Sequence, residues 1–163
     1  LARRGERCEC IRYREVRARP LQVSDLRLED LAYAAGAAEE HFLSFVTPED
    51  GLAGYLRLSL PGPASPSLGL DDLEGAALVR ELHVYGESLA LGVEEAHAAQ
   101  HAGLGRRLML HAEAIAARAG YTRLAVIAAL GTRGYYMRLG YRLGETYMLK
   151  DLPAAAQDEK GGA

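Results

Sequence analysis

Cysteine is scarce in this sequence, which has only Cys8 and Cys10 among its 163 residues. Two cysteines cannot form the disulfide framework of a small secreted domain. No stretch approaches the roughly 18 apolar residues of a membrane span, and residues 1–6 are too polar for a signal peptide. These absences predict a cytoplasmic protein without a membrane partner. Because the sequence begins with Leu rather than Met, we also expect a fragment or a processed chain.

Lysine is nearly absent as well, so arginine carries most of the positive charge. Residues 1–19 contain seven Arg against three Glu, and residues 103–150 contain seven Arg and one Lys against two Glu. These basic segments could together form a face that binds a polyanion such as CoA or RNA. The alternative is that the arginines are simply solvated.

The composition, with 49% apolar and 25% charged residues, is that of one globular domain with a real core. We divide the chain into an Arg-rich leader (1–20), a domain (21–150) and a flexible tail (151–163). Apolar alternation and short apolar runs predict strands, and longer periodic segments predict helices. The expected strands are 27–33, 41–45, 52–60, 76–85, 124–128 and 141–149, and the expected helices are 103–119 and 131–139. This order predicts an α/β fold with a mixed sheet, in which the unit 76–128 forms a parallel strand pair.

The segment 100–107, Gln-His-Ala-Gly-Leu-Gly-Arg-Arg, lies between an expected loop (86–99) and the clearest expected helix. Gly103 and Gly105 allow the backbone to approach a ligand closely. A helix that begins here would direct its unpaired N–H groups and its positive dipole end at that ligand. The pattern predicts a phosphate-binding loop, and its spacing Gln-x-x-Gly-x-Gly resembles the pyrophosphate loop of the GNAT acetyltransferases.

Further motifs resemble the acetyltransferase domain of the Elongator catalytic subunit. They are Val-Arg-Glu-Leu-His-Val-Tyr-Gly at 79–86, Gly-Thr-Arg-x-Tyr-Tyr-x-Arg-x-Gly-Tyr at 131–141, and Tyr-Met-x-Lys at 147–150. The resemblance covers roughly residues 8–152. It implies a GNAT fold with a mostly antiparallel sheet, and the use of acetyl-CoA to modify wobble uridine in tRNA. Members of this family also carry a radical-SAM domain, and this sequence has no cysteine triplet for its iron–sulfur cluster. The cluster and SAM would therefore belong to a domain missing here, which would act in cis or in trans.

The resemblance also implies roles for individual residues. Backbone N–H groups of Gly103, Leu104 and Gly105 would bind the CoA pyrophosphate, and Arg106 or Arg107 would add contacts to phosphate. The remaining cofactor contacts would come from Gln100, Tyr135 and the strand residues Glu81, Leu82, His83 and Val84. Glu81 is the candidate general base and Tyr136 the candidate acid at the CoA sulfur. The alternatives are a structural carboxylate at Glu81, a core histidine at His83 and a packed tyrosine at either Tyr135 or Tyr136.

Cys8 and Cys10 resemble part of a Cys-x-Cys-x-x-Cys zinc element, but Tyr13 occupies the third position. A structural zinc needs four ligands, so Cys8 and Cys10 would hold zinc only with a histidine and further ligands from elsewhere. Two other functions remain open from the sequence: a free-standing GNAT enzyme that acetylates a lysine or small amine, and a non-catalytic module that binds CoA or RNA for assembly.

Overall fold

The computed structural model describes residues 8–16, 21–85 and 96–153, with residues 96–102 as backbone alone. Its centre is a seven-stranded sheet in the order β1-β2-β3-β4-β5-β7-β6. The strands are β1 (Arg27–Ala35), β2 (Ala38–Val46), β3 (Leu52–Pro61), β4 (Ala76–Val84), β5 (Arg123–Val126), β6 (Arg142–Leu143) and β7 (Met148–Asp151). Only β4 and β5 pair in parallel within this sheet. The predicted mixed, mostly antiparallel sheet is therefore confirmed.

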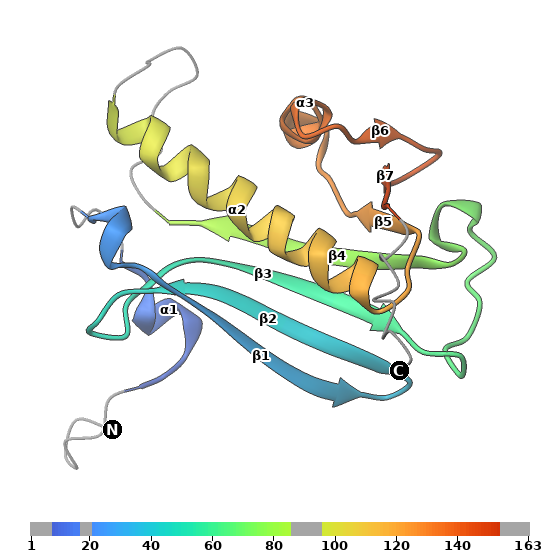
Figure 1. Cartoon of the computed structure of the whole chain (residues 1–163), viewed down its shortest axis with the longest axis horizontal. Helices are drawn as coiled ribbons and strands as arrows, with labels where there is room; N and C mark the ends of the chain where they lie inside the picture. The colour runs from blue at the N-terminus through green and yellow to red at the C-terminus, as the bar shows by residue number, and fades with distance from the viewer. Residues whose placement is uncertain (1–7, 17–20, 86–95, 154–163) are drawn as a thin grey trace, which may run out of the picture.

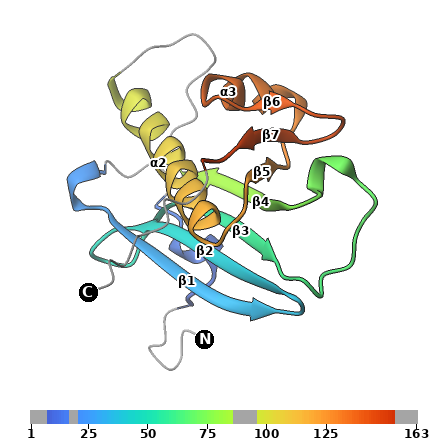
Figure 2. The same cartoon turned by 45° about the vertical axis from the view of Figure 1, so that its right-hand side comes forward.

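Helix α2 (Ala96–Arg118) lies across one face of the sheet, as Figure 1 shows. Figure 2 shows β4, β5, β7 and the short helix α3 (Arg133–Arg138) on one side of α2, with β1 to β3 on the other. The apolar side of α2 packs on the middle strands and forms the main core. Its fully buried members include Leu104, Leu108 and Ala112 of α2, and Leu43, Phe45, Leu56, Leu58 and Ala77 of the sheet.

The leader contributes to this packing. Residues 11–14 form the short helix α1 (Ile11–Arg14), and Arg14 forms an ion pair with Asp50 at 2.6 Å. The N–H of Val16 donates to the carbonyl of Leu52, and the side chain of Val16 is buried in the core. Residues 11–16 are thus part of the globular unit, although they precede the expected boundary at residue 21.

The last predicted strand, 141–149, was wrong as a single element. The structure contains two short strands, β6 and β7, which pair antiparallel. Asp72 lies in a short 3-10 helix (Asp71–Leu73) before β4. Its carboxylate accepts the backbone N–H groups of Glu145, Thr146 and Tyr147 at 3.3, 2.8 and 3.0 Å. These three groups bond to Asp72 instead of a neighbouring strand, so the chain turns here.

The predicted start of the main helix at Gly103 was also wrong. Helix α2 begins at Ala96, seven residues earlier. The segment 96–102 contains four alanines, the residue with the highest helix propensity, and this favours extension of the helix toward its N-terminus. The part of the predicted 86–99 loop that the structure describes, residues 96–99, is helical.

Candidate functional site

The end of β4 extends beyond its neighbour. Residues 76–79 pair with β5 at 123–126, and the N–H of Ile127 then donates to the carbonyl of Val79 at 3.1 Å. From Glu81 to Val84, β4 pairs with β3 on one side, and no described strand pairs with its other side. This exposed backbone edge can accept an extended amide-containing ligand arm through strand-like hydrogen bonds.

A β-bulge determines which side chains of β4 face α2. Arg57 pairs with Glu81, whereas the next residue of β3, Leu58, pairs with Val79, so Arg80 is the extra residue. Without the bulge, Glu81 would lie on the same sheet face as Val79, because side chains alternate along a strand. With it, Leu82 and Val84 pack against the core under α2, and Glu81 and His83 lie on the opposite face.

Three of the predicted cofactor residues meet at the end of β4. A Cβ atom built on Gly105 would lie 2.7 Å from the hydroxyl of Tyr135 and 3.5 Å from a methyl group of Val84. Gly105 therefore permits α2, α3 and β4 to approach one another closely. By contrast, a Cβ on Gly103 would have no neighbour within 4 Å, so that position borders open space.

The hydroxyl of Tyr135 is buried and has no hydrogen-bond partner among the described residues. Burial raises its pKa, while the charges of Arg138 and Arg106 lower it by smaller amounts. The hydroxyl is therefore protonated at neutral pH and can donate to a ligand. An unpartnered buried hydroxyl is costly for the fold. Because it lies next to the unpaired edge of β4, this hydroxyl is placed to donate a hydrogen bond to a ligand bound there.

The predicted phosphate cradle is not formed in this conformation. Gly103, Leu104 and Gly105 lie in the interior of α2, where each N–H belongs to the helical hydrogen-bond ladder. The side chain of Leu104 is fully buried in the core. Gln100 lies in the backbone-only part of α2, so the role predicted for its side chain falls outside the described residues.

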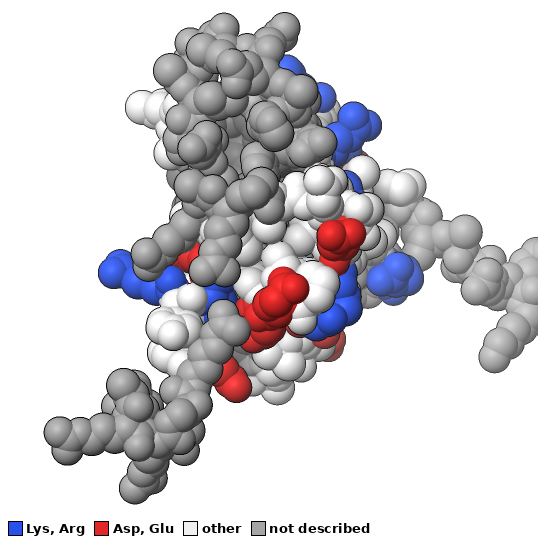
Figure 3. All heavy atoms as spheres, turned by 90° about the vertical axis from the view of Figure 1, so that its left-hand side faces the viewer, with Lys and Arg blue, Asp and Glu red and all other residues white. Residues whose placement is uncertain are grey.

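The two arginines after the glycines differ in their surroundings. The guanidinium of Arg107 lies over the ring of Phe45, 4.5 Å from its centroid. Arg106 is exposed and close enough to Tyr135 to lower its pKa. Arg106 is therefore the better placed of the two for an anionic ligand at this end. Figure 3 views this end of the molecule, where acidic and basic groups are interspersed and no field of one sign forms among the described residues.

The two candidate catalytic side chains are not brought together. Tyr136 is 6% exposed and packs in the core between Tyr135 and Tyr141, with ring centroids 5.2 and 5.9 Å away. Its pKa is raised to about 12, mainly by burial. Glu81 lies on the opposite face of the sheet from Tyr136. Of the two tyrosines, it is Tyr135 whose hydroxyl lies beside the unpaired edge of β4.

Glu81 belongs to a polar group on that opposite face. The hydroxyl of Tyr55 donates to its Oε1 at 3.1 Å, and His83 Nε2 lies 3.4 Å from the same oxygen. Arg57 lies 3.7 Å from its Oε2. Burial and then the charge of Glu81 raise the pKa of Tyr55, so this hydroxyl stays protonated and orients the carboxylate. Sequence reasoning missed Tyr55 and Arg57, because their proximity depends on the register between β3 and β4.

A match to a family of known proteins agrees with this geometry. The family described as "Acetyltransferase (GNAT) family" matches residues 10–141. The chain belongs to the GNAT acetyltransferase family.

Several named proteins resemble this GNAT chain. It is 44% identical over 156 residues to the tRNA uridine(34) acetyltransferase of Dehalococcoides mccartyi, covering 93% of this chain and 34% of the relative. It is 41% identical over 157 residues to Elongator complex protein 3 of Danio rerio, covering 91% and 28%. Among solved structures, the archaeal Methanocaldococcus infernus Elp3 superposes with a TM-score of 0.74 at 35% identity, covering 93% of this chain and 37% of that one. The GNAT chain thus spans about a third of the length of these relatives.

The cysteine pair of this GNAT chain lies near the start of the described part. The sulfur atoms of Cys8 and Cys10 are 3.1 Å apart, and a hydrogen bond from Cys8 lowers the pKa of Cys10. Within residues 8–16, 21–85 and 96–153, no three His, Cys, Asp or Glu side chains are placed to hold a metal ion. Among the described helices of this domain, none has the length and apolar character to cross a bilayer.

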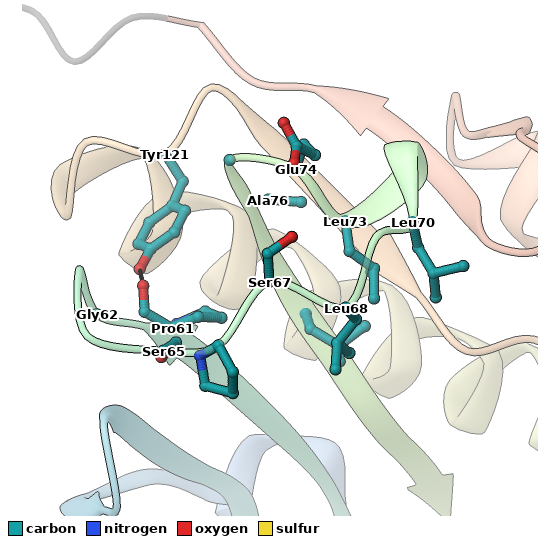
Figure 4. Close-up of a pocket in the computed structure, with 13 residues that line it drawn as sticks. Pro61, Gly62, Ser65, Ser67, Leu68, Leu70, Leu73, Glu74, Ala76 and Tyr121 are labelled. Carbon is teal, nitrogen blue, oxygen red and sulfur yellow. Dashed lines mark hydrogen bonds between the residues drawn. The ribbon is translucent and has the colours of Figure 1, made fainter.

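A separate cavity of about 330 Å³ lies at the other end of β4. Figure 4 shows its lining, which includes Leu68, Leu70 and Leu73 of the loop before β4, and Tyr121, whose hydroxyl donates to the carbonyl of Pro61 at 2.6 Å. Ala76, where β4 begins, also lines it. Because the strand rises about 3.3 Å per residue, this cavity is roughly 25 Å from Val84. It is therefore not part of the site at Gly105.

Proposed function

We propose that this GNAT domain binds acetyl-CoA and acts in the modification of wobble uridine in tRNA, through cleavage of the acetyl-CoA thioester. The observation that carries the proposal is the meeting of three features: the β4 edge, Gly105 and the Tyr135 hydroxyl. Neither the edge nor the hydroxyl has a partner among the described residues. The relatives named tRNA uridine(34) acetyltransferase and Elongator complex protein 3 support the choice of acceptor. The cytoplasmic location expected from the sequence belongs to the same proposal.

The residues of the chain suggest how the cofactor would be held. The backbone of residues 80–84 would pair with the pantetheine arm, and Arg106 would contact phosphate. The glycines would contribute N–H groups only if the first turns of α2 open, because those groups are now inside the helix. Acetyl-CoA supplies an acetyl thioester, whose leaving group is a thiolate.

The structure also suggests how the catalytic roles are distributed. A buried tyrosine hydroxyl with a raised pKa is a proton donor at neutral pH. We therefore propose Tyr135 as the residue that donates to the CoA sulfur, with Tyr136 supporting its ring from the core. Glu81 remains the proposed base, acting from the other face of the sheet on the acceptor.

The proposal is tested by calorimetry with acetyl-CoA, using Gly103→Glu as the control because it adds a negative charge and bulk where CoA phosphates would lie. We expect binding by the parent protein and strong weakening in the variant. Thiol release is then measured with protein alone, with tRNA and with a lysine peptide. Absence of binding by the parent protein would refute the proposal.

Release with the peptide alone would favour a lysine or small-amine acetyltransferase. Binding without release, even with tRNA, would favour a non-catalytic CoA-binding or RNA-binding module. Thiol release that requires tRNA is the result expected here. A radical-SAM domain, in cis or in trans, would complete the uridine modification.

A further inference from the structure

The sheet face opposite α2 carries a row of rings across three strands. Phe42 of β2 stacks on Tyr55 of β3, with centroids 5.1 Å apart and planes 26° apart. Tyr55 in turn stacks on His83 of β4 at 5.2 Å and the same angle. We call Phe42, Tyr55 and His83 the ring row. Tyr85 supports it, with its ring 6.4 Å from that of His83 and 17° from parallel.

The ring row ends at the exposed edge of β4. Tyr55, in the middle, is only 5% exposed, whereas the side chain of His83 is 52% exposed. Beyond Val79, no described strand pairs with the outer side of β4. Stacking on Tyr55 orients the His83 ring, and the exposed part of that ring is available to a ligand at this edge of the sheet.

Polar groups beside His83 complement one class of planar ligand. Glu81, 3.4 Å from His83, offers carboxylate oxygens that accept hydrogen bonds, and Arg57 offers N–H donors next to it. Uracil has an N–H group flanked by two carbonyl oxygens. The carboxylate of Glu81 would accept from that N–H group, and the guanidinium of Arg57 would donate to a carbonyl oxygen. Single-stranded RNA bases are commonly bound by stacking on protein rings with hydrogen bonds to the base edge.

We infer that the His83 end of the ring row is the acceptor subsite, and that it binds an unstacked uracil base of RNA. This inference rests on the proposed function for the identity of the acceptor and adds where the base binds. It assigns the opposite faces of the sheet to different ligands. The CoA sulfur lies on the side of Tyr135, and the base lies on the side of Glu81 and His83.

The first experiment uses the parent protein without cofactor and a fluorescein-labelled tRNA anticodon stem-loop that carries uridine at the wobble position. A second stem-loop carries dihydrouridine there, which keeps the N–H and both carbonyls but loses the planar ring. Fluorescence anisotropy should show the dihydrouridine probe binding about tenfold more weakly, the order expected for the loss of one stacked base. Equal affinity for the two probes would overturn the inference.

The second experiment varies the protein. His83→Ala should weaken uridine binding by about tenfold and abolish the difference between the two probes, while His83→Phe, which restores a ring, should keep the affinity within about threefold. Tyr33→Ala is the matched control, because Tyr33 is an exposed ring on β1 outside the row. A larger loss for Tyr33→Ala than for His83→Ala would also overturn the inference.

These outcomes are separable from the proposed function. The RNA assays contain no acetyl-CoA, so a failure of cofactor binding in calorimetry refutes the proposed function and leaves the anisotropy result intact. If acetyl-CoA binds and a lysine peptide is acetylated, but the stem-loop does not bind, the subsite accepts an amine and the inference is wrong.

Discussion

Replacing Tyr135 by Phe should stabilise the fold and impair the chemistry. The Tyr135 hydroxyl is buried without a partner in the described part of the chain. Burial of an unpaired hydroxyl costs on the order of 1–2 kcal/mol, so its removal should raise the free energy of unfolding by a similar amount. For a domain of this size that corresponds to a rise of about 2–8 °C in Tm. If the hydroxyl protonates the leaving thiolate, tRNA-dependent thiol release should fall on the order of a hundredfold.

The position of Gly105 gives this prediction an internal check. In the parent protein, Gly105→Ala gains about 1 kcal/mol of helix propensity. Its Cβ, however, would lie 2.7 Å from the Tyr135 hydroxyl, a contact that requires one side to move. In the Tyr135→Phe background the next atoms, a methyl group of Val84 and Cζ of the ring, lie at 3.5 and 3.6 Å, which is ordinary contact.

The two substitutions should therefore couple. We expect a coupling energy of about 1–3 kcal/mol in a double-mutant cycle, with the double variant more stable than either single variant. Urea unfolding of all four proteins measures the cycle, and thiol release is measured on the same samples. Additive effects would show that Gly105 and the hydroxyl do not approach as described. A loss of stability in Tyr135→Phe would show that the hydroxyl has a partner.

Three further predictions concern stability. Hydrogen bonds from backbone N–H groups, that of Thr146 foremost, hold the pKa of Asp72 below its usual value. The ionised Asp72 therefore stabilises the fold fully above about pH 4, and this contribution declines as the pH falls through the lower pKa of the folded state. Asp72→Asn should lower the free energy of unfolding by about 1–3 kcal/mol at pH 7, measured by urea unfolding. A difference between parent and variant that stays the same below pH 4 would contradict this prediction. Lys150→Met should lower the free energy of unfolding by about 2 kcal/mol, because it leaves the Glu113 carboxylate, which lies 2.8 Å from the Lys150 ammonium, without its cation. An unchanged Tm in calorimetric unfolding of this variant would refute the prediction. Acetyl-CoA at 100 times its Kd should raise the free energy of unfolding of the parent protein by about 2.7 kcal/mol, or its Tm by about 5–11 °C, and should change that of Gly103→Glu little. An equal shift of Tm in both proteins would contradict the proposed site.

Local patterns in the sequence were sufficient for most of the fold. The alternation at residues 55–60 identifies β3, although both faces of that strand are largely buried. The apolar run at 124–128 identifies β5, which is also buried. The parallel pairing of β4 and β5 follows from the helix between them. These features depend on residues close together in the chain.

The candidate site was less accessible, because its geometry depends on distant contacts. The bulge at Arg80 places Glu81 on the opposite face from Val79, and no local pattern indicates an extra residue in a strand. The motif resemblance identified Gly105 and Tyr135 as cofactor residues, but only the structure shows that the hydroxyl of one faces the backbone of the other. Asp72 could not be predicted to divide the last strand, since the N–H groups it binds follow it by 73 to 75 residues.

The position of β7 has a consequence for the synthesis of this domain. β7 lies between β5 and β6 and brings Met148, Leu149 and Leu152 into buried positions. Among the described strands it is also the last to leave the ribosome. Until these residues have emerged, β5 lacks its antiparallel partner β7, and Asp72 lacks the N–H groups that it binds. The nascent chain therefore cannot close its sheet during translation of the first six strands, and folding of the domain is completed only after residue 152 has been released from the ribosomal tunnel.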